Sequence, residues 1–413
     1  QKDFENTIKN LSLSQKDIEI KKFSLDNFIN KGFPNRKEED WKFSDLNQII
    51  NKNIGELSFY CEDKPTNKVD TSVFLDGLEH NKIVFINGRI EKIDFDYEKK
   101  GQIEIIEHSE TINKFYDKNS LSDLNNAFTN KSCKIAVKEG YQLSKPLIIY
   151  HTTNTKINSC NINLRLDFEL HENSCLRLID LFNDKSEKNF LNIFYNFDLK
   201  ENSILKNYKV DKFENKNIKY LFNNIDQNKN SISETFILSS GSNFLKSEIN
   251  CDLNGEYSSA FVNGIFSLDK NKHHEIRTII NHLTENTKSY QLIKCVLEDS
   301  SKAVYQGKIF VNSEAQKTDG YQLSKAILLN KESEFNAKPE LEIYADDVKC
   351  SHGSTYGSID KDAIHYLMTR GIEQSKAKKL LINGFLNEVF EHVSEKEIKT
   401  FLIKSVEEQI DGI

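Results

Sequence analysis

The chain has 413 residues, a formal net charge of −7 and a sequence pI near 5.9. This length is enough for two or three domains, and the acidic balance excludes a protein that binds nucleic acid through a basic face. The seven cysteines are dispersed without a Cys-x-x-Cys pair, the first residues show no apolar leader, and no apolar run approaches the roughly 20 residues of a membrane span. We therefore expect a cytoplasmic protein with reduced thiols rather than a disulfide framework.

Residues 1–80 are predicted to form an N-terminal helical domain, because apolar residues recur there at helical spacing. Gly32 and Pro34 mark a break between helices. Shortly after this break lies Trp41, the only tryptophan of the chain. We interpret Trp41 as a packing anchor rather than as part of a functional site.

Residues 81–358 are predicted to form a β-rich core with a helical insertion near residues 109–130. A repeat runs through this core: an apolar residue, a small residue (usually Ser) four positions later, and a second apolar residue two positions after that. The lead residues at 238, 253, 268, 283, 297 and 311 are 15, 15, 15, 14 and 14 positions apart. One short strand and one turn need about this length, which favours a β-solenoid of roughly 30-residue coils over a sandwich. We expect the lead residues to stack into one apolar column, with the small residue fitting the turn.

A hexapeptide supports the idea of repetition, since Gly-Tyr-Gln-Leu-Ser-Lys occurs at 140–145 and again at 320–325. Each copy is expected to lead into an apolar strand. The two ends of a solenoid need covers, and we expect the N-terminal helical domain to cover one end. A C-terminal helical domain at 359–413 is expected to cover the other. Its helix signals are Asp360 as an N-cap, Gly371 after the first helix, and a capping box from Ser394 to Glu397.

The sequence lacks the motifs of several enzyme classes, including the phosphate-binding loop of ATPases and the H-E-x-x-H motif of zinc proteases. We therefore do not expect the chain to hydrolyse ATP alone. Three histidines cluster in the repeat region, His273, His274 and His282, and we interpret them as structural. His274 and Glu275 are expected to form a polar rung.

Cys350 and His352 are the strongest candidates for chemistry. They follow an alternating, strand-like run and stand two positions apart, so a strand would point both side chains to one face. Asp346 and Asp347 come just before them. A thiolate and an imidazole are soft metal ligands, but an iron–sulfur cluster needs about four ligands. On the residues alone, a buried cysteine and a hydrogen-bonded histidine at a strand end remain the alternative.

Several segments carry a resemblance to a known family. Residues 304–311, 315–318, 338–353 and 366–372, together with 36–46 and 124–128, resemble the SufB/SufD family of scaffolds for iron–sulfur cluster assembly by the SUF system, and are most similar to its SufD branch. The likeness spans nearly the whole chain. Two departures are Ser354, where the family usually has Ala, and His365, where it usually has an aromatic residue.

The resemblance implies a parallel, right-handed β-helix with helical domains at both ends and a non-enzymatic role in a complex with SufB and the ATPase SufC. It implies that Cys350 and His352 lie near the interface with SufB and contribute, as cofactor and metal ligands, to a nascent iron–sulfur cluster. It also implies that SufC docks on the C-terminal helical domain. The residues expected to contact SufC are Tyr366, Leu367, Arg370, Gly371, Ile372 and Phe385.

Three alternatives stay open. The chain resembles SufB less, because SufB is generally longer and carries further cysteine-bearing segments. A β-solenoid enzyme acting on carbohydrate or transferring acyl groups would need paired carboxylates or a general base in a groove along the coils. A purely structural partner would use Cys350 and His352 for packing only. Without SufB, the chain is expected to be able to form a homodimer.

Overall fold

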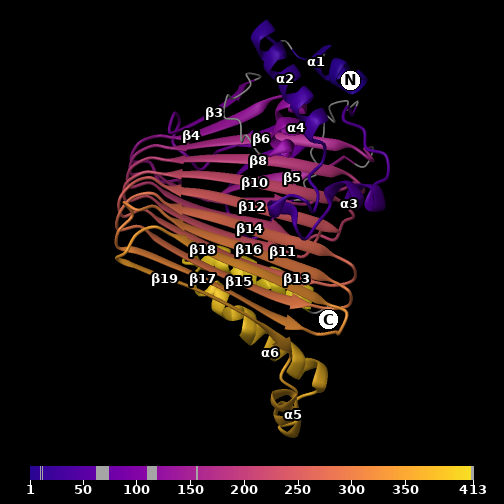
Figure 1. Ribbon diagram of the computed structural model, residues 1–413, viewed down its shortest axis with the longest axis vertical. Helices are drawn as coiled ribbons and strands as arrows, with labels where there is room; N and C mark the ends of the chain where they lie inside the picture. The colour runs from indigo at the N-terminus through magenta and orange to yellow at the C-terminus, as the bar shows by residue number, and fades with distance from the viewer. Residues whose placement is uncertain (10, 12, 62–73, 109–118, 155–156, 411–413) are drawn as a thin grey trace.

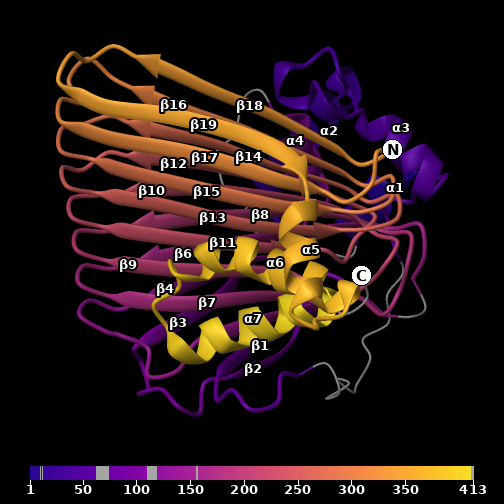
Figure 2. The same cartoon turned by 90° about the horizontal axis from the view of Figure 1, so that it is seen from below.

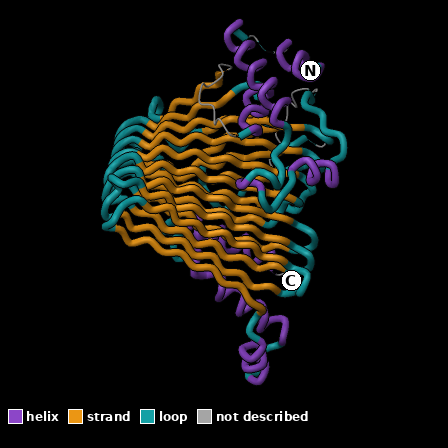
Figure 3. The backbone as a smooth tube through the Cα atoms, in the orientation of Figure 1, coloured by secondary structure: helices purple, strands orange, loops and turns teal. Residues whose placement is uncertain are grey.

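The computed structural model describes residues 1–9, 11, 13–61, 74–108, 119–154 and 157–410. Two large sheets run the length of the molecule, with helices outside them (Figures 1 and 3). The helices are α1 (Lys2–Lys9), α2 (Gln15–Lys31), the 3-10 helix η1 (Glu39–Trp41), α3 (Leu46–Asn53), α4 (Ser120–Phe128), α5 (Lys361–Thr369), α6 (Gln374–Phe390) and α7 (Lys396–Ile410).

The strands divide between a ten-stranded and a nine-stranded sheet. In order along the sheet, the ten-stranded sheet contains β19 (Val348–Ser358), β17 (Thr318–Leu328), β15 (Lys288–Leu297), β13 (Ser259–Leu268), β11 (Ile232–Ser239), β9 (Ile204–Asp211), β7 (Cys175–Phe182), β5 (Leu147–Thr152), β1 (Asn81–Ile86) and β2 (Arg89–Asp94). The nine-stranded sheet contains β18 (Glu334–Ile343), β16 (Lys302–Val311), β14 (His273–His282), β12 (Phe244–Leu253), β10 (Ile218–Gln227), β8 (Phe190–Leu199), β6 (Asn161–Leu170), β4 (Ser132–Val137) and β3 (Ile103–His108).

From β4 onward, successive strands alternate between the two sheets, and strands two apart in the chain pair in parallel. His273 lies opposite Phe244, 29 positions earlier, and opposite Lys302, 29 positions later. Each coil therefore holds two strands, one in each sheet. This confirms the β-solenoid and the coil length predicted from the repeat.

The small residue of the repeat lies in the turn between strands. Ser203 donates a hydrogen bond from its hydroxyl to the carbonyl of Lys200 over 2.7 Å, and Ser174 donates in the same way to His171 over 2.6 Å. The residue before each serine is an asparagine in the left-handed region, with φ of 58° at Asn202 and 59° at Asn173. Asparagine tolerates this region better than most residues, so the turn chemistry explains the repeat.

The lead residues form two columns rather than the single column predicted. Leu170 lies opposite Leu199 in the nine-stranded sheet, whereas Leu268 lies opposite Leu297 in the ten-stranded sheet. The single column is wrong because successive repeat units alternate between the sheets. Leu283 was predicted to be a member of the column, but it lies after the end of β14. His282, the last residue of β14, lies opposite Leu253 instead.

The two copies of the hexapeptide adopt different structures. The copy at 320–325 lies inside β17, whereas the copy at 140–145 forms an irregular turn in which Gly140 has a φ of 67°. The copy at 140–145 leads into β5, as predicted, whereas the copy at 320–325 is itself part of a strand. β17 pairs with β15 on one side and with β19 on the other. This pairing holds the hexapeptide at 320–325 in an extended conformation, although the same hexapeptide forms a turn at 140–145.

The N-terminal helices lie on a face of the solenoid. Together with α4 they pack on the outer side of β8, β10 and β12, in a cluster that includes Trp41, Leu46, Phe194 and Tyr220. Trp41 is 3% exposed and stacks on Tyr220, with ring centroids 5.7 Å apart, which confirms its role as a packing anchor. Of the insertion predicted at 109–130, Ser120–Phe128 is helical, and 109–118 lie outside the described residues.

Charged residues fasten this N-terminal segment to the nine-stranded sheet. The Lys246 ammonium donates to the carbonyl of Asp40 over 2.7 Å and to Glu275 over 2.8 Å, and it lies 4.5 Å from the centre of the Trp41 ring. Arg277 pairs with the Asp40 carboxylate. Because Lys246 and Glu275 are buried, this contact is shielded from solvent.

The C-terminal helices α6 and α7 lie across the outer face of the ten-stranded sheet (Figure 2). Their buried residues Ile382, Leu386, Phe390 and Leu402 pack against this face. The expectation that helices cover the two ends is wrong, because the N-terminal and C-terminal helices bury their apolar residues against the outer faces of the two sheets. The boundaries 1–80, 81–358 and 359–413 stay a prediction.

The two ends of the solenoid differ. At the N-terminal end the last strands, β2 and β3, have six residues each and pair antiparallel with their neighbours, and the β1–β2 pair contains a register shift. At the C-terminal end, β18 and β19 have 10 and 11 residues and pair in parallel on one side only. Short, bulged strands discourage further pairing, so the C-terminal end is the open one.

Cys61 and Cys160 form a disulfide, with their Cα atoms 6.2 Å apart. The expectation of seven reduced thiols is therefore wrong for this pair. The two residues are 99 positions apart in the sequence and meet because the chain at Ser58 pairs with the chain at Cys160, just before β6. None of the helices in the described residues is long and apolar enough to cross a membrane.

Candidate functional site

Cys350 and His352 lie on β19, the last strand of the ten-stranded sheet. β19 pairs with β17 on one side, where Cys350 lies opposite Gly320 and His352 lies opposite Gln322. The strand predicted for these two residues is confirmed. Because they are two positions apart, both side chains lie on one face of the strand.

Cys350 is half-buried. It packs against a small apolar cluster of Ile309, Val311 and Ala315 at the end of the lumen, which is the interior between the two sheets. Gly320 lies close to the thiol, since a Cβ atom there would be in van der Waals contact with Sγ at 3.4 Å. Burial raises the pKa of the Cys350 thiol, and a backbone hydrogen bond involving Gly320 acts in the opposite direction. The thiol therefore needs a metal ion or a base to become a thiolate ligand.

His352 is exposed, and in the described part of the chain its imidazole makes no hydrogen bond or ion pair. Asp346 and Asp347 lie in the turn before β19, where the Asp347 amide donates to Gln316 over 2.9 Å. No three His, Cys, Asp or Glu side chains among the described residues come together to hold a metal ion. The two acids therefore do not complete a ligand set with Cys350 and His352.

A buried polar network lies in the lumen directly beneath His352. Gln322 and Gln291 follow His352 down the same column of the sheet, and both are fully buried. The Tyr305 hydroxyl is 3.0 Å from Gln291 Oε1 and 3.3 Å from Gln322 Oε1, and Gln322 donates to the carbonyl of Glu340 over 3.2 Å. Gly307 makes room for this network, because a Cβ atom there would be 2.1 Å from Gln322 Oε1.

Sequence reasoning missed this network. The sequence feature that indicates this network is a glutamine at the same lumen-facing position of two neighbouring coils, Gln291 and Gln322. Gly307 lies across the lumen from Gln322. The two coils are recognised as neighbours only once the register is known. A hydrogen bond between Ser324 and Ser354 over 3.0 Å extends the polar contacts along β17 and β19.

The open end also carries exposed apolar side chains. Tyr356 on β19 is 67% exposed, and Tyr344, which follows β18, is 62% exposed. Both lie at strands that have a free edge. The combination of unpaired backbone groups and exposed aromatic rings is typical of a surface that pairs with another chain.

The residues predicted to contact the ATPase partner fall into two places. Tyr366 and Leu367 lie on α5, and Arg370 to Ile372 follow directly; the Arg370 guanidinium is 5.3 Å from the centre of the Tyr366 ring. None of the residues of α5 is buried, and the helix projects away from the sheets (Figure 1). Phe385 does not join them, because it lies on α6, half-buried against the ten-stranded sheet, with the Lys294 ammonium 4.6 Å from its ring centre.

Of the three clustered histidines, the two buried ones are held in the neutral form. Burial lowers the pKa of His274 and of His282 to about 4. His274 contacts the Ser239 hydroxyl and the Ser242 carbonyl, each over 2.7 Å. The predicted rung of His274 and Glu275 is wrong, because neighbouring residues of a strand face opposite sides; Glu275 contacts His273 over 2.8 Å.

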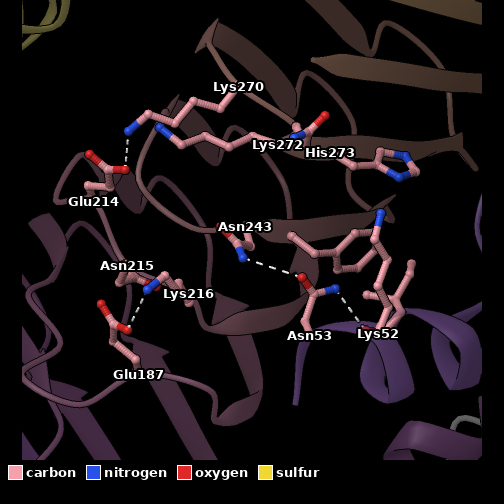
Figure 4. Close-up of a pocket in the computed structure, with 13 residues that line it drawn as sticks. Lys52, Asn53, Glu187, Glu214, Asn215, Lys216, Asn243, Lys270, Lys272 and His273 are labelled. Atoms are coloured by element: carbon pink, nitrogen blue, oxygen red, sulfur yellow. Dashed lines mark hydrogen bonds and ion pairs between the residues drawn. The ribbon is translucent and has the colours of Figure 1, made fainter. Parts of the chain in front are cut away.

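A cleft between the N-terminal segment and the middle coils lies far from Cys350 along the sheet order. It has a volume of about 650 Å³ and lies between α3 and the turns of the middle coils (Figure 4). Two of its lysines pair with its two glutamates, Lys216 with Glu187 over 3.1 Å and Lys270 with Glu214, and Lys52 and Lys272 leave the lining net positive. The described residues of the lining include no cysteine that could act as a thiolate ligand, so we place the candidate site at the open end.

Comparisons with known proteins agree with one another. Residues 151–385 match the family described as SUF system FeS cluster assembly, SufBD core domain. The chain is 29% identical over 398 residues to the iron–sulfur cluster assembly protein SufD of Escherichia coli (strain K12), which covers 94% of this chain and 92% of that protein.

Two further relatives match over shorter shares. The iron–sulfur cluster assembly protein SufD of Plasmodium falciparum (isolate 3D7) is 27% identical over 318 residues, which is 76% of this chain and 21% of that protein. The protein ABCI7, chloroplastic, of Arabidopsis thaliana is 42% identical over 112 residues, which is 27% of this chain and 24% of that protein.

Proposed function

This chain belongs to the SufBD family and is a SufD-type subunit for iron–sulfur cluster assembly; from that premise we propose that it is a non-catalytic scaffold that works in a complex with SufB and the ATPase SufC. Within that complex, Cys350 and His352 supply ligands to a nascent cluster, which is the cargo of the complex. The right-handed winding of the solenoid, the division at 81 and 359, and a cytoplasmic location are parts of the same proposal.

One observation carries the site. Cys350 and His352 lie on the same face of the last strand, at the end of the lumen, where the backbone edge is unpaired. A cluster needs about four ligands, and this face offers two. A second chain that pairs with the open end would bring further ligands to the same place, so the site is best understood as half of a shared one.

The two ligands differ in what they need. Because burial raises the pKa of the Cys350 thiol, Cys350 becomes a thiolate by releasing its proton as it binds iron. The exposed imidazole of His352 is available as a neutral nitrogen ligand. Nucleotide chemistry belongs to SufC, for which α5 offers a projecting helix with Tyr366, Leu367 and Arg370.

The site is tested by reconstituting the three-protein complex with Cys350→Ala or His352→Ala in this chain. We expect each variant to lose more than half of the iron and acid-labile sulfide found after co-expression, while complex formation is retained. Cys175→Ala is the matched control, since Cys175 is also half-buried but lies on β7, at the opposite end of the sheet order. Wild-type iron and sulfide in both site variants would leave only a packing role for the two residues.

The docking surface is tested separately. Arg370→Ala and Tyr366→Ala are expected to weaken binding of SufC to this chain in a pull-down or by calorimetry, because both side chains are exposed on or beside α5. Phe385→Ala serves as a contrast, since Phe385 packs against the sheet and its loss should lower stability more than SufC binding. Equal SufC binding by all variants would move the docking surface elsewhere.

A further inference from the structure

The disulfide between Cys61 and Cys160 lies where three parts of the chain meet. Ser58 pairs with the residues around Cys160, with the Ser58 amide donating to Ser159 and the Asn161 amide donating to Ser58, each over 2.8 Å. From α1, the carboxylate of Asp3 accepts the backbone amide of Phe59 over 2.8 Å. The crosslink is therefore the covalent part of a contact between the N-terminal helical segment and the solenoid.

Cys160 is held firmly, whereas Cys61 is approachable. Cys160 is 6% exposed, and its backbone amide donates to Asn189 of the next coil over 3.0 Å. Cys61 is half-buried and lines a small cavity of about 50 Å³ between Thr7, Arg89 and Phe128. A small thiol or peroxide thus has a route to the sulfur of Cys61.

The five other cysteines differ from this pair. Cys133, Cys251 and Cys295 are buried, and burial raises the pKa of each thiol. Burial also raises the pKa of Cys175 and of Cys350, and none of the five is bonded to another cysteine. Protonated thiols react slowly with disulfides and peroxides.

We propose that Cys61 and Cys160 are a reversible thiol–disulfide modification site that fastens the N-terminal helical segment to the solenoid. When the bond forms, the two Sγ atoms join and release two protons and two electrons, which hydrogen peroxide takes up as it is reduced to water. A small dithiol reverses the step by exchange: its first thiolate attacks one sulfur, its second closes a cyclic disulfide, and both cysteines leave as thiols.

The modification site is independent of the proposed cluster site. Cys160 immediately precedes β6, near one end of the nine-stranded sheet, while Cys350 is on β19 at the other end of the solenoid. The oxidised form holds residues 58–61 against β6 covalently. In the reduced form the same segment is held by the Ser58 pairing, the Asp3 contact and the packing of Phe59 against Phe33 and Phe128.

Thiol counting tests the pairing. The full-length chain, treated with hydrogen peroxide and then denatured without reductant, is expected to show five free thiols, and seven after dithiothreitol. Cys61→Ser should show six thiols in both states, and the control Cys175→Ser should show four and then six. Peptide mapping should recover one crosslink, between Cys61 and Cys160. Seven thiols in the peroxide-treated chain, or a different crosslink, would overturn the assignment.

Hydrogen exchange tests the fastening. We expect the amides of residues 58–61 to exchange at least tenfold faster in the reduced wild type than in the oxidised wild type. Cys61→Ser should exchange at the fast rate in both states, and Cys175→Ser should follow the wild type. Equal exchange in the oxidised and reduced wild type would show that the bond does not hold the segment, whatever the thiol count.

Discussion

Two buried histidines inside the solenoid, His274 and His282, have hydrogen-bond partners at both ring nitrogens, and these contacts decide how the two side chains respond to pH. His274 contacts a serine hydroxyl at Nδ1 and a backbone carbonyl at Nε2, and His282 contacts the hydroxyls of Thr287 and Ser289. Each set of contacts suits a neutral imidazole. The structural role predicted for the clustered histidines is confirmed for these two.

Acid is expected to destabilise the protein through these histidines. The unfolded chain takes up their protons as the pH falls through about 6.5, whereas the folded chain keeps both neutral until about 4. Between these values the unfolded state binds more protons, so stability that is fully present above pH 6.5 is lost as the pH falls. The loss is up to about 3 kcal/mol for each histidine.

Denaturant unfolding at several pH values between 4 and 7 measures this effect. His274→Gln should start less stable than the wild type but lose less stability on acidification. His365→Gln, a change at an exposed histidine on α5, should leave the pH slope as it is. An unchanged slope in His274→Gln would mean that other groups cause the acid loss.

Gly307 is expected to be required for the polar network beneath His352. In Gly307→Ala the new methyl would be 2.1 Å from Gln322 Oε1 and 2.4 Å from the Tyr305 hydroxyl, which forces these buried groups apart. We expect a loss of about 1–3 kcal/mol in the free energy of unfolding. Gly384→Ala, on α6 with open space around the added methyl, should instead add up to about 1 kcal/mol.

At the scale of the element, the sequence shows the length of one coil of the solenoid but not which strands pair between coils. The spacing of Leu and Ser residues predicted the coil length and the turn, because turns such as those at Asn173 and Asn202 have a left-handed residue followed by a serine that closes the turn. It did not predict which coils stack in which column, since alternation between two sheets depends on how the chain folds back. Cys350 and His352 were recognised because their spacing lies within one strand. Gln322 was missed because its position beneath His352 depends on the pairing between coils.

Turn substitutions are expected to separate backbone strain from side-chain bonding. The Asn202 side chain donates to Asn173 over 3.1 Å and accepts from Asn230 over 3.0 Å, and its φ is 58°. Asn202→Gly and Asn202→Val both remove these bonds, but only valine is strained at positive φ. Thermal or denaturant unfolding should show Asn202→Val about 1–2 kcal/mol less stable than Asn202→Gly. Equal stabilities would mean that the turn relaxes to accept valine.

At the scale of the whole molecule, the helices lie on the faces of the solenoid and leave its C-terminal end free. The C-terminal helical domain was predicted from its capping signals, and α7 buries Ile398, Leu402 and Val406. Spacing does not tell against which surface a helix packs, which is why helices on the faces were mistaken for covers at the ends.

The open end is expected to make the isolated chain self-associate. At increasing concentration, light scattering after size-exclusion chromatography should show a dimer, formed by pairing at β18 and β19 with Tyr356 buried between the chains. Tyr356→Lys should shift this equilibrium toward the monomer, at least tenfold in the dissociation constant. Tyr97→Lys alters a tyrosine that is 46% exposed at the other end and should leave it unchanged. Dimerisation that Tyr356→Lys does not weaken would place the contact elsewhere.

The difference between the two ends also sets a limit on stoichiometry. A solenoid with two adhesive ends would add neighbours without limit and grow into a fibre. Here the strands at the N-terminal end are short and antiparallel, while those at the C-terminal end are long and each have one unpaired edge. Such a molecule accepts one neighbour along its axis, and the pair that results has no free adhesive end, so growth stops at two.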